Sequence, residues 1–168
     1  NDKENLLPVY IETTNFELKN VSSKATTKTQ VFAVAPQNCI QKESGDCYSN
    51  ELNLFSKFHK GLKVDYDIWH KVSLEKLASH VSSKLDKNLL IVDAFCGVGG
   101  NSIQFAVDGN FVLAIDIDPK RLEFIQYNAS KYNVSDKIEY CHCDFLNFKT
   151  NGKTDLVFLN PSWDSATS

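Results

Sequence analysis

The spacing of hydrophobic positions changes near residue 88, and this change divides the chain. Between residues 73 and 85 apolar side chains recur every three or four positions, which predicts an amphipathic helix with Ser73 as its N-cap. After Asn88 short continuous apolar runs alternate with helical segments. Continuous apolar runs of this length predict strands that are covered on both faces, as in a parallel sheet.

The downstream part has the pattern of an α/β fold. Its order is βαβαββ, which is typical of a doubly wound, Rossmann-like sheet. Asn101 and Gln104 are spaced as a capping box at the start of the first of these helices, and Asp118 before Pro119 predicts the start of the second. Because the chain stops nine residues after Leu159, we expect the sheet to be truncated after its fourth strand. The four predicted strands are residues 89–93, 111–116, 138–141 and 155–159.

The upstream part has much weaker patterning. Residues 1–50 contain scattered polar side chains without periodicity, and we expect a mobile tail there. One run, at residues 31–35, is strand-like, but Pro36 ends it and the sequence leaves open whether it docks on the sheet. We expect residues 51–88 to form an N-terminal helical lobe and residues 89–168 to form the α/β core.

Composition is that of an ordinary globular domain, with 42% hydrophobic and 23% charged residues in 168 positions. No apolar run approaches the roughly 18 residues that a membrane helix requires, so no membrane association is expected. The chain begins at Asn1 and contains no methionine, from which we expect a piece of a longer protein. Five cysteines without CxxC spacing favour a reducing compartment and argue against structural zinc.

Charge is distributed unevenly along the chain. The formal net charge of −3 argues against a protein that coats nucleic acid indiscriminately. Residues 1–88 carry 12 basic and 11 acidic side chains, whereas residues 89–168 carry 6 and 10. Any surface that contacts RNA is therefore expected mainly in the upstream part.

The first predicted strand runs into a glycine-rich loop, DAFCGVGG at residues 93–100. Glycines between a strand and a helix let a ligand approach the backbone closely. The loop differs from the dinucleotide fingerprint GxGxxG, and it starts with an acid. A carboxylate there suits the amino group and sulfonium of S-adenosylmethionine better than a pyrophosphate, so the loop favours that cofactor over NAD. The candidate cofactor contacts in this loop are Asp93, Phe95, Cys96, Gly97 and Gly99.

Further candidate contacts follow the second and third predicted strands. Asp116 ends the second strand, 19 residues beyond Gly97, where an acid typically receives the two hydroxyls of an adenosine ribose. Asp144 comes just after the third strand, where a carboxylate can accept a hydrogen bond from an adenine amine. Phe145 beside it can cover the adenine ring, although a solvated loop aspartate explains Asp144 equally well.

The fourth predicted strand ends in Asn160-Pro161-Ser162-Trp163, at the ligand-binding edge of such a sheet. The amide oxygen of Asn160 and the carbonyl of Pro161 can both accept hydrogen bonds from an exocyclic amine and align its lone pair with a methyl group. We therefore assign these two residues to catalysis. Trp163 offers a π surface on which positively charged N7-methylguanine would stack, with a cation–π contribution of about 0.5–2 kcal/mol.

Residues 52–163 resemble one family, and six blocks of sequence carry the resemblance. They are LFSKF at 54–58, GLKVD at 61–65, Trp69, VDAFCGVGGN at 92–101, IQFA at 103–106 and AIDIDP at 114–119. The chain resembles the trimethylguanosine synthases, which are class I S-adenosylmethionine-dependent methyltransferases. The resemblance implies methylation of guanine N2 on the m7G cap of small nuclear and nucleolar RNA by a nuclear, and secondarily cytoplasmic, monomer that uses no metal. It also implies that the helical lobe closes over cofactor and cap, with Phe55 and Lys57 as substrate contacts.

The resemblance has one departure, and the residues leave other functions open. The family has two consecutive prolines before the tryptophan, and Ser162 replaces the second, which is expected to loosen this turn. The Asn-Pro motif also fits methylation of adenine N6, of guanine N2 in structural RNA, or of a glutamine amide. A noncatalytic module that binds S-adenosylmethionine or RNA is the alternative from a different class.

Overall fold

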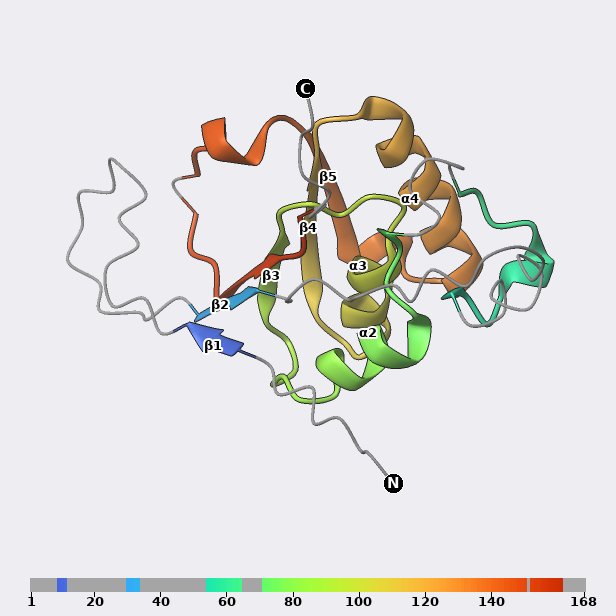
Figure 1. Cartoon of the computed structure of the whole chain (residues 1–168), viewed down its shortest axis with the longest axis horizontal. Coiled ribbons are helices and arrows are strands. Elements are labelled where there is room, and N and C mark those ends of the chain that lie inside the picture. The colour runs from blue at the N-terminus through green and yellow to red at the C-terminus, as the bar shows by residue number, and fades with distance from the viewer. Residues whose placement is uncertain (1–8, 12–29, 34–53, 65–70, 151, 162–168) are drawn as a thin grey trace, which may run out of the picture.

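The strands of this computed structural model, which describes residues 9–11, 30–33, 54–64, 71–150 and 152–161, form a single sheet (Figure 1). The sheet order is β1-β2-β6-β3-β4-β5. The five strands from β2 to β5 in this order run parallel, and β1 is antiparallel to β2. The four strands predicted downstream of residue 88 are confirmed. The bounds are β1 Val9–Ile11, β2 Gln30–Ala33, β3 Leu90–Asp93, β4 Phe111–Asp116, β5 Ile138–His142 and β6 Leu156–Leu159.

The strand-like run upstream does join the sheet. β2 pairs in parallel with β6, with Gln30 opposite Leu156 and Ala33 opposite Leu159. The sheet of the described residues therefore extends beyond the four strands that the sequence predicts. Two short segments of the expected tail take part in it, and the division of the chain into tail, lobe and core stays a prediction.

Helices α3 and α4 connect the parallel strands and lie on the same side of the sheet (Figure 1). Helix α2 packs on α3. Asp118 caps α4 as predicted, since its carboxylate accepts a hydrogen bond of 2.9 Å from the Lys120 N–H. The helices are α2 Glu75–Ser82, α3 Gly100–Val107 and α4 Pro119–Tyr132, with short 3-10 helices η1 Phe58–Lys60, η3 Ser135–Lys137 and η4 Phe145–Asn147.

Two of the predicted helix caps are wrong. Helix α2 begins at Glu75, and Leu74 occupies the N-cap position without a side-chain hydrogen bond. Helix α3 begins at Gly100 after a left-handed residue, Gly99, so Asn101 lies inside the helix and forms no capping box. Both polar side chains that sequence spacing assigned to capping, Ser73 and Asn101, bond to each other instead.

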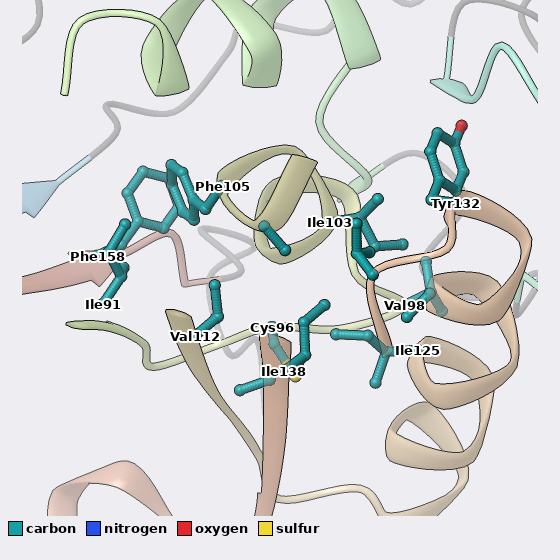
Figure 2. Packing of buried hydrophobic residues seen from close by; sticks show 14 of the residues in the cluster. Ile91, Cys96, Val98, Ile103, Phe105, Val112, Ile125, Tyr132, Ile138 and Phe158 are labelled. Carbon is teal, nitrogen blue, oxygen red and sulfur yellow. The ribbon is translucent and has the colours of Figure 1, made fainter. Parts of the chain in front are cut away.

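The larger core lies between the sheet and helices α3 and α4 (Figure 2). Phe105 of α3 meets Phe158 of β6 edge to face, with ring centroids 5.0 Å apart. Ile125 of α4 is fully buried against the same face. A smaller cluster around Val92 and Val157 covers the other face, where the segment after β5 packs. The sheet is thus held from both sides at the strand ends that build the site.

A buried amide of α4, Asn128, is one of the groups that attach the described part of the lobe to this helix. Asn128, fully buried, accepts a hydrogen bond of 2.8 Å from the Lys63 N–H and donates one of 2.8 Å to the Lys63 carbonyl. It also donates to the carbonyl of Val98 at 3.0 Å. Because Val98 belongs to the glycine loop, this single side chain ties lobe, helix and loop together.

Candidate functional site

The strand order reverses beside β3, which has β4 and β5 on one side and β6 on the other. Parallel sheets bind ligands in the crevice outside the carboxyl ends of the strands at such a switch point. A cavity of about 310 Å³ opens there. Eight residues predicted from the sequence line it: Phe95, Cys96, Gly97, Asp116, Asp144, Phe145, Asn160 and Pro161.

Other predicted residues lie away from the cavity wall. Asp93 and Gly99 are buried behind the loop that lines it. Phe55 is 1% exposed and packs in the larger core, so the structure gives it a packing role. The Lys57 ammonium lies 4.6 Å from the Tyr132 ring centroid, over α4. Trp163, like the Ser162 departure, lies outside the described residues.

Asp93 is a buried carboxylate with one unsatisfied oxygen. Its Oδ2 accepts a hydrogen bond of 2.5 Å from the Ser102 hydroxyl, but within the described residues its Oδ1 has no hydrogen-bond partner. Burial raises the pKa of Asp93 to about 6, against the lowering effect of the Ser102 hydrogen bond. A cation placed in the cavity would favour the charged form of this group, because an opposite charge offsets the cost of desolvation.

Asp116 holds the glycine loop in place. Its Oδ2 accepts the N–H of Gly97 at 2.9 Å, and its Oδ1 accepts the N–H of Asp118 at 3.0 Å. A carboxylate has about four lone-pair sites, so Asp116 keeps capacity for two further donors such as a pair of ribose hydroxyls. Arg121, in the first turn of α4, lies 3.8 Å from Asp116 Oδ1.

The glycines of the loop have different roles. Gly97 adopts a φ of 52° and faces the cavity, which suits a backbone that a ligand must approach. Gly99 adopts a φ of 98°, and a Cβ there would lie 2.6 Å from Cγ1 of Ile125. Gly99 therefore allows α4 to pack closely behind the loop, which is a role different from the predicted cofactor contact.

Aromatic side chains form one wall of the cavity. The rings of Phe95 and Phe145 meet edge to face at 5.9 Å, and Phe148 stacks on Phe145 at 6.4 Å. Asp144 precedes this wall and caps η4, accepting hydrogen bonds of 3.0 Å from the N–H of Leu146 and the amide of Asn147. Asp144 therefore has a local structural role as the cap of η4, and it also lines the cavity.

Asn160 and Pro161 enter the cavity from the end of β6. The amide nitrogen of Asn160 donates a hydrogen bond of 3.2 Å to the Ser73 hydroxyl. This bond engages the nitrogen side of the amide. The arrangement can therefore present hydrogen-bond acceptors at one end of a cavity whose other end carries Asp116 and the aromatic wall.

Sequence reasoning missed several residues of the cavity wall. Ile117 directly follows β4 and is 66% exposed. Its position as a large apolar residue between two acids, Asp116 and Asp118, was the signal in the sequence for a ligand contact. Nothing in the local spacing indicated the segment before α2, because a site assembled from distant segments has no sequence period. The missed residues are Lys71, Val72, Ser73, Val98, Gly100, Asn101, Ile117, Arg121 and Cys143, together with Ala94 of the loop.

Metal-ligand clusters and membrane-spanning helices are both missing from the part of the chain that the structure describes. There, no group of three or more His, Cys, Asp or Glu side chains is arranged to hold a metal ion. The sulfur atoms of Cys141 and Cys143 lie 3.4 Å apart, as the alternation of a strand places them. None of the described helices combines the length and apolar character needed to cross a membrane.

Comparison with known proteins agrees with the geometry. Residues 88–166 match the family described as RNA cap guanine-N2 methyltransferase. Trimethylguanosine synthase of Schizosaccharomyces pombe is 35% identical over 125 residues, covering 69% of this chain and 52% of that protein. The protein of the same name from Saccharomyces cerevisiae is 29% identical over 126 residues, covering 69% and 40%. The chain thus spans about half, or less, of the length of these two relatives.

Among solved structures, the tRNA m1G37 methyltransferase of M. jannaschii is similar, with a TM-score of 0.47 and 27% identity over 52% of this chain and 28% of that one. The cap-methyltransferase resemblance predicted from the sequence blocks is confirmed by the sequence matches. Residues 88–166, which contain most of the described α/β sheet, are therefore similar to the RNA cap guanine-N2 methyltransferase family.

Proposed function

We propose that this protein transfers methyl groups from S-adenosylmethionine to the guanine N2 amine of the m7G cap of RNA, giving the 2,2,7-trimethylguanosine cap. The observation that carries the proposal is the placement of Asn160 and Pro161 in the same cavity as Asp116 and the glycine loop. One end of the cavity suits an adenosine, and the other end suits an exocyclic amine. The names of the two yeast relatives point to the same reaction.

The described residues fit the cofactor on structural grounds. The unpartnered Oδ1 of Asp93 supplies buried negative charge behind the loop, and Asp116 keeps lone pairs for ribose hydroxyls. Phe95 and Phe145 provide apolar surface for a purine ring. When bound, S-adenosylmethionine supplies an electrophilic methyl group on a positively charged sulfur.

The residues after β6 would orient the acceptor amine. The oxygen of the Asn160 amide and the carbonyl of Pro161 accept the two N2 hydrogens, which turns the nitrogen lone pair toward the methyl carbon. The bound cofactor would supply the methyl group to the guanine N2, with the electron pair of its carbon–sulfur bond remaining on sulfur. The amine proton leaves to water, helped by the positive charge on the N7-methylated ring. Most of the rate enhancement would come from orientation of two bound partners.

The proposal also covers the cap-stacking residue, the class of RNA, the oligomeric state and the cellular location. Trp163 stacks on the N7-methylguanine ring, the RNAs are small nuclear and nucleolar RNAs, and the protein acts as a monomer in the nucleus and also in the cytoplasm. The Trp163 stack is supported by its position three residues after Asn160. The test is the affinity of Trp163→Ala for m7G caps relative to unmethylated guanosine caps, which should lose its preference for m7G.

We further assign the lysines of the lobe to the RNA backbone. Residues 54–64 contain three lysines and no acid. The ammonium groups of Lys63 and Lys131 both lie over the Tyr127 ring, at 4.5 and 4.4 Å from its centroid. Lys57 lies beside the same end of α4, over Tyr132. This concentration of positive charge suits the phosphates that follow the cap, which is the role proposed here for Lys57.

Titration calorimetry of this chain with S-adenosylmethionine and with an m7G cap analogue tests the proposal, followed by mass spectrometry of the cap after incubation with both. Mass gains of one and two methyl groups on guanine N2 are expected. Binding of both ligands without transfer would contradict the proposal in favour of a binding module. Cofactor binding without cap binding would point to a different amine, and adenine N6, structural-RNA guanine N2 and glutamine amide substrates would be assayed next.

A further inference from the structure

Two asparagine side chains from separate parts of the fold both donate hydrogen bonds to the hydroxyl of Ser73. The Asn101 amide nitrogen of α3 donates a hydrogen bond of 2.9 Å to Ser73 Oγ, and the Asn160 amide nitrogen donates one of 3.2 Å to the same oxygen. Ser73 and Asn101 are each 9% exposed, so water competes little for these bonds. Ser73 and Asn160 both line the cavity.

The hydrogen bond from the Asn160 amide nitrogen to Ser73 defines the direction of the Asn160 amide. A serine hydroxyl has two acceptor lone pairs, and the two amide groups use both. An amide has one donor side and one acceptor side, which are nearly identical in shape. Holding the nitrogen of Asn160 on Ser73 therefore places its oxygen on the opposite side, where it can accept a hydrogen bond.

The segment that carries Ser73 is itself held firmly against α3. A Cβ on Gly100 would lie 3.2 Å from Cγ1 of Val72 and 3.5 Å from the Ser73 carbonyl, so the glycine allows the two backbones to approach. Two residues later, Glu75 accepts a hydrogen bond of 3.3 Å from the Gln104 amide. Ser73 thus lies between two fixed points on α3.

We propose that Ser73 is a positioning residue that holds the Asn160 amide with its oxygen toward the acceptor amine, with Asn101 fixing the Ser73 hydroxyl. This inference rests on the proposed methyl transfer. Without the hydroxyl, the Asn160 amide is free to turn over and present its N–H groups to the amine of the substrate. A donor would then face a donor, and the fraction of productively oriented complexes would fall.

Methylation kinetics separate this role from a purely structural one. In the full chain, Ser73→Ala should lower kcat for cap methylation by about tenfold, in proportion to one lost orienting hydrogen bond, with little change in the dissociation constant of S-adenosylmethionine. Ser73→Thr keeps the hydroxyl and should recover most of kcat. Ser83→Ala is the matched control and should leave kcat unchanged, because among the described residues its exposed hydroxyl bonds only to the His80 carbonyl at the end of α2.

The NMR signals of the Asn160 side-chain amide test the positioning role of Ser73 independently of methyl transfer. The side-chain NH2 resonances of Asn160, assigned by their loss in Asn160→Asp, should shift and exchange faster with water in Ser73→Ala than in Ser73→Thr. Unchanged resonances, or wild-type kcat in Ser73→Ala, would overturn the positioning role. If the wild-type chain transfers no methyl group, the proposed function fails, whereas the resonances still decide whether Ser73 holds the amide.

Discussion

The hydroxyl of Ser102 lies 2.5 Å from Oδ2 of Asp93, and this is the hydrogen bond that restrains the pKa of a carboxyl buried at the end of β3. Burial nevertheless dominates and raises that pKa to about 6, with Asp116 as the second carboxylate that acts in the same direction. In the ligand-free protein Asp93 therefore keeps its proton at pH values where an exposed aspartate has lost it.

The binding of a cationic cofactor should depend on pH through Asp93. The bound cation favours the carboxylate, so binding below the raised pKa requires loss of a proton, and affinity for S-adenosylmethionine should rise about tenfold between pH 5 and pH 7. Calorimetry across this range measures it. Ser102→Ala should move the midpoint of the rise to higher pH, and Asp93→Asn should give weaker, pH-independent binding. A wild-type affinity that stays flat across this window would contradict the assignment.

The raised pKa of Asp93 also makes the stability of the fold depend on pH. Between about pH 4 and pH 6 the folded chain holds the Asp93 proton and the unfolded chain does not, so this group makes the free energy of unfolding fall as pH rises through that window. In Asp93→Asn this contribution should be absent. Urea denaturation of the two proteins at several pH values in the window gives the comparison, and parallel pH profiles would show that the carboxyl titrates normally.

Asp116 and Asp118 offer a matched pair for the cofactor site. Asp116→Asn removes the charged acceptor of the Gly97 N–H and of the ribose hydroxyls, so cofactor affinity should fall at least about tenfold. Asp118→Ala removes the cap of α4 and the ion pair with Arg121, which should cost about 1 kcal/mol of stability with cofactor affinity retained. If both variants lost the same affinity, the ribose role of Asp116 would have to be abandoned in favour of a general effect on α4.

Substitutions at two glycines with positive φ, Gly109 and Gly99, distinguish the cost of backbone strain from the cost of a steric clash. Gly109 has a φ of 102° and open space where a Cβ would be, so Gly109→Ala should cost about 1–2 kcal/mol from strain alone. Gly99→Ala has comparable strain and also clashes with Ile125, and should cost about 1–3 kcal/mol more. Chemical denaturation measures both. Equal costs would mean that α4 can move away from the loop without penalty.

The lysines of the lobe predict a dependence on RNA length and salt. Changing Lys57, Lys60 and Lys63 together to Gln should weaken binding of a capped oligonucleotide but leave binding of the isolated cap analogue unchanged. The slope of log affinity against log salt should become shallower by about 2, because single-stranded RNA contributes about 0.7 per phosphate contact. Lys84→Gln with Lys87→Gln, at exposed positions beyond α2, is the control pair and should leave the slope intact. Equal losses for both ligands would place these lysines at the cap itself.

The sequence predicted local features of this fold better than assembled ones. Continuous apolar runs located all four downstream strands, because a strand that is buried on both faces appears in the sequence as an uninterrupted run of apolar residues. Asp116, Asp144 and Asn160 line the cavity because parallel strands end at one edge of the sheet, whereas Asp93 is buried behind it. The N-cap of α4 could be predicted from two adjacent residues, Asp118 and Pro119.

Predictions failed where a side chain had a distant partner. Ser73 and Asn101 have the residue types and spacing of caps, but each finds its hydrogen bond in the other. The same limit applies to Phe55, whose interleaving with lysines suited stacking on a base although the ring packs in the core. Gly99 looked like part of a ligand loop because its contact with Ile125 comes from the next helix.

The pairing of β2 with β6 has a consequence for how the chain folds. Among the described strands β6 comes latest in the sequence, yet it bonds to β3 on one side and to β2 on the other. During synthesis β2 would leave the ribosome long before its parallel neighbour exists, and closing so long a loop is slow. Asn160 and Pro161 directly follow β6, so the part of the cavity that we propose for the methyl acceptor would form later than the glycine loop between β3 and α3.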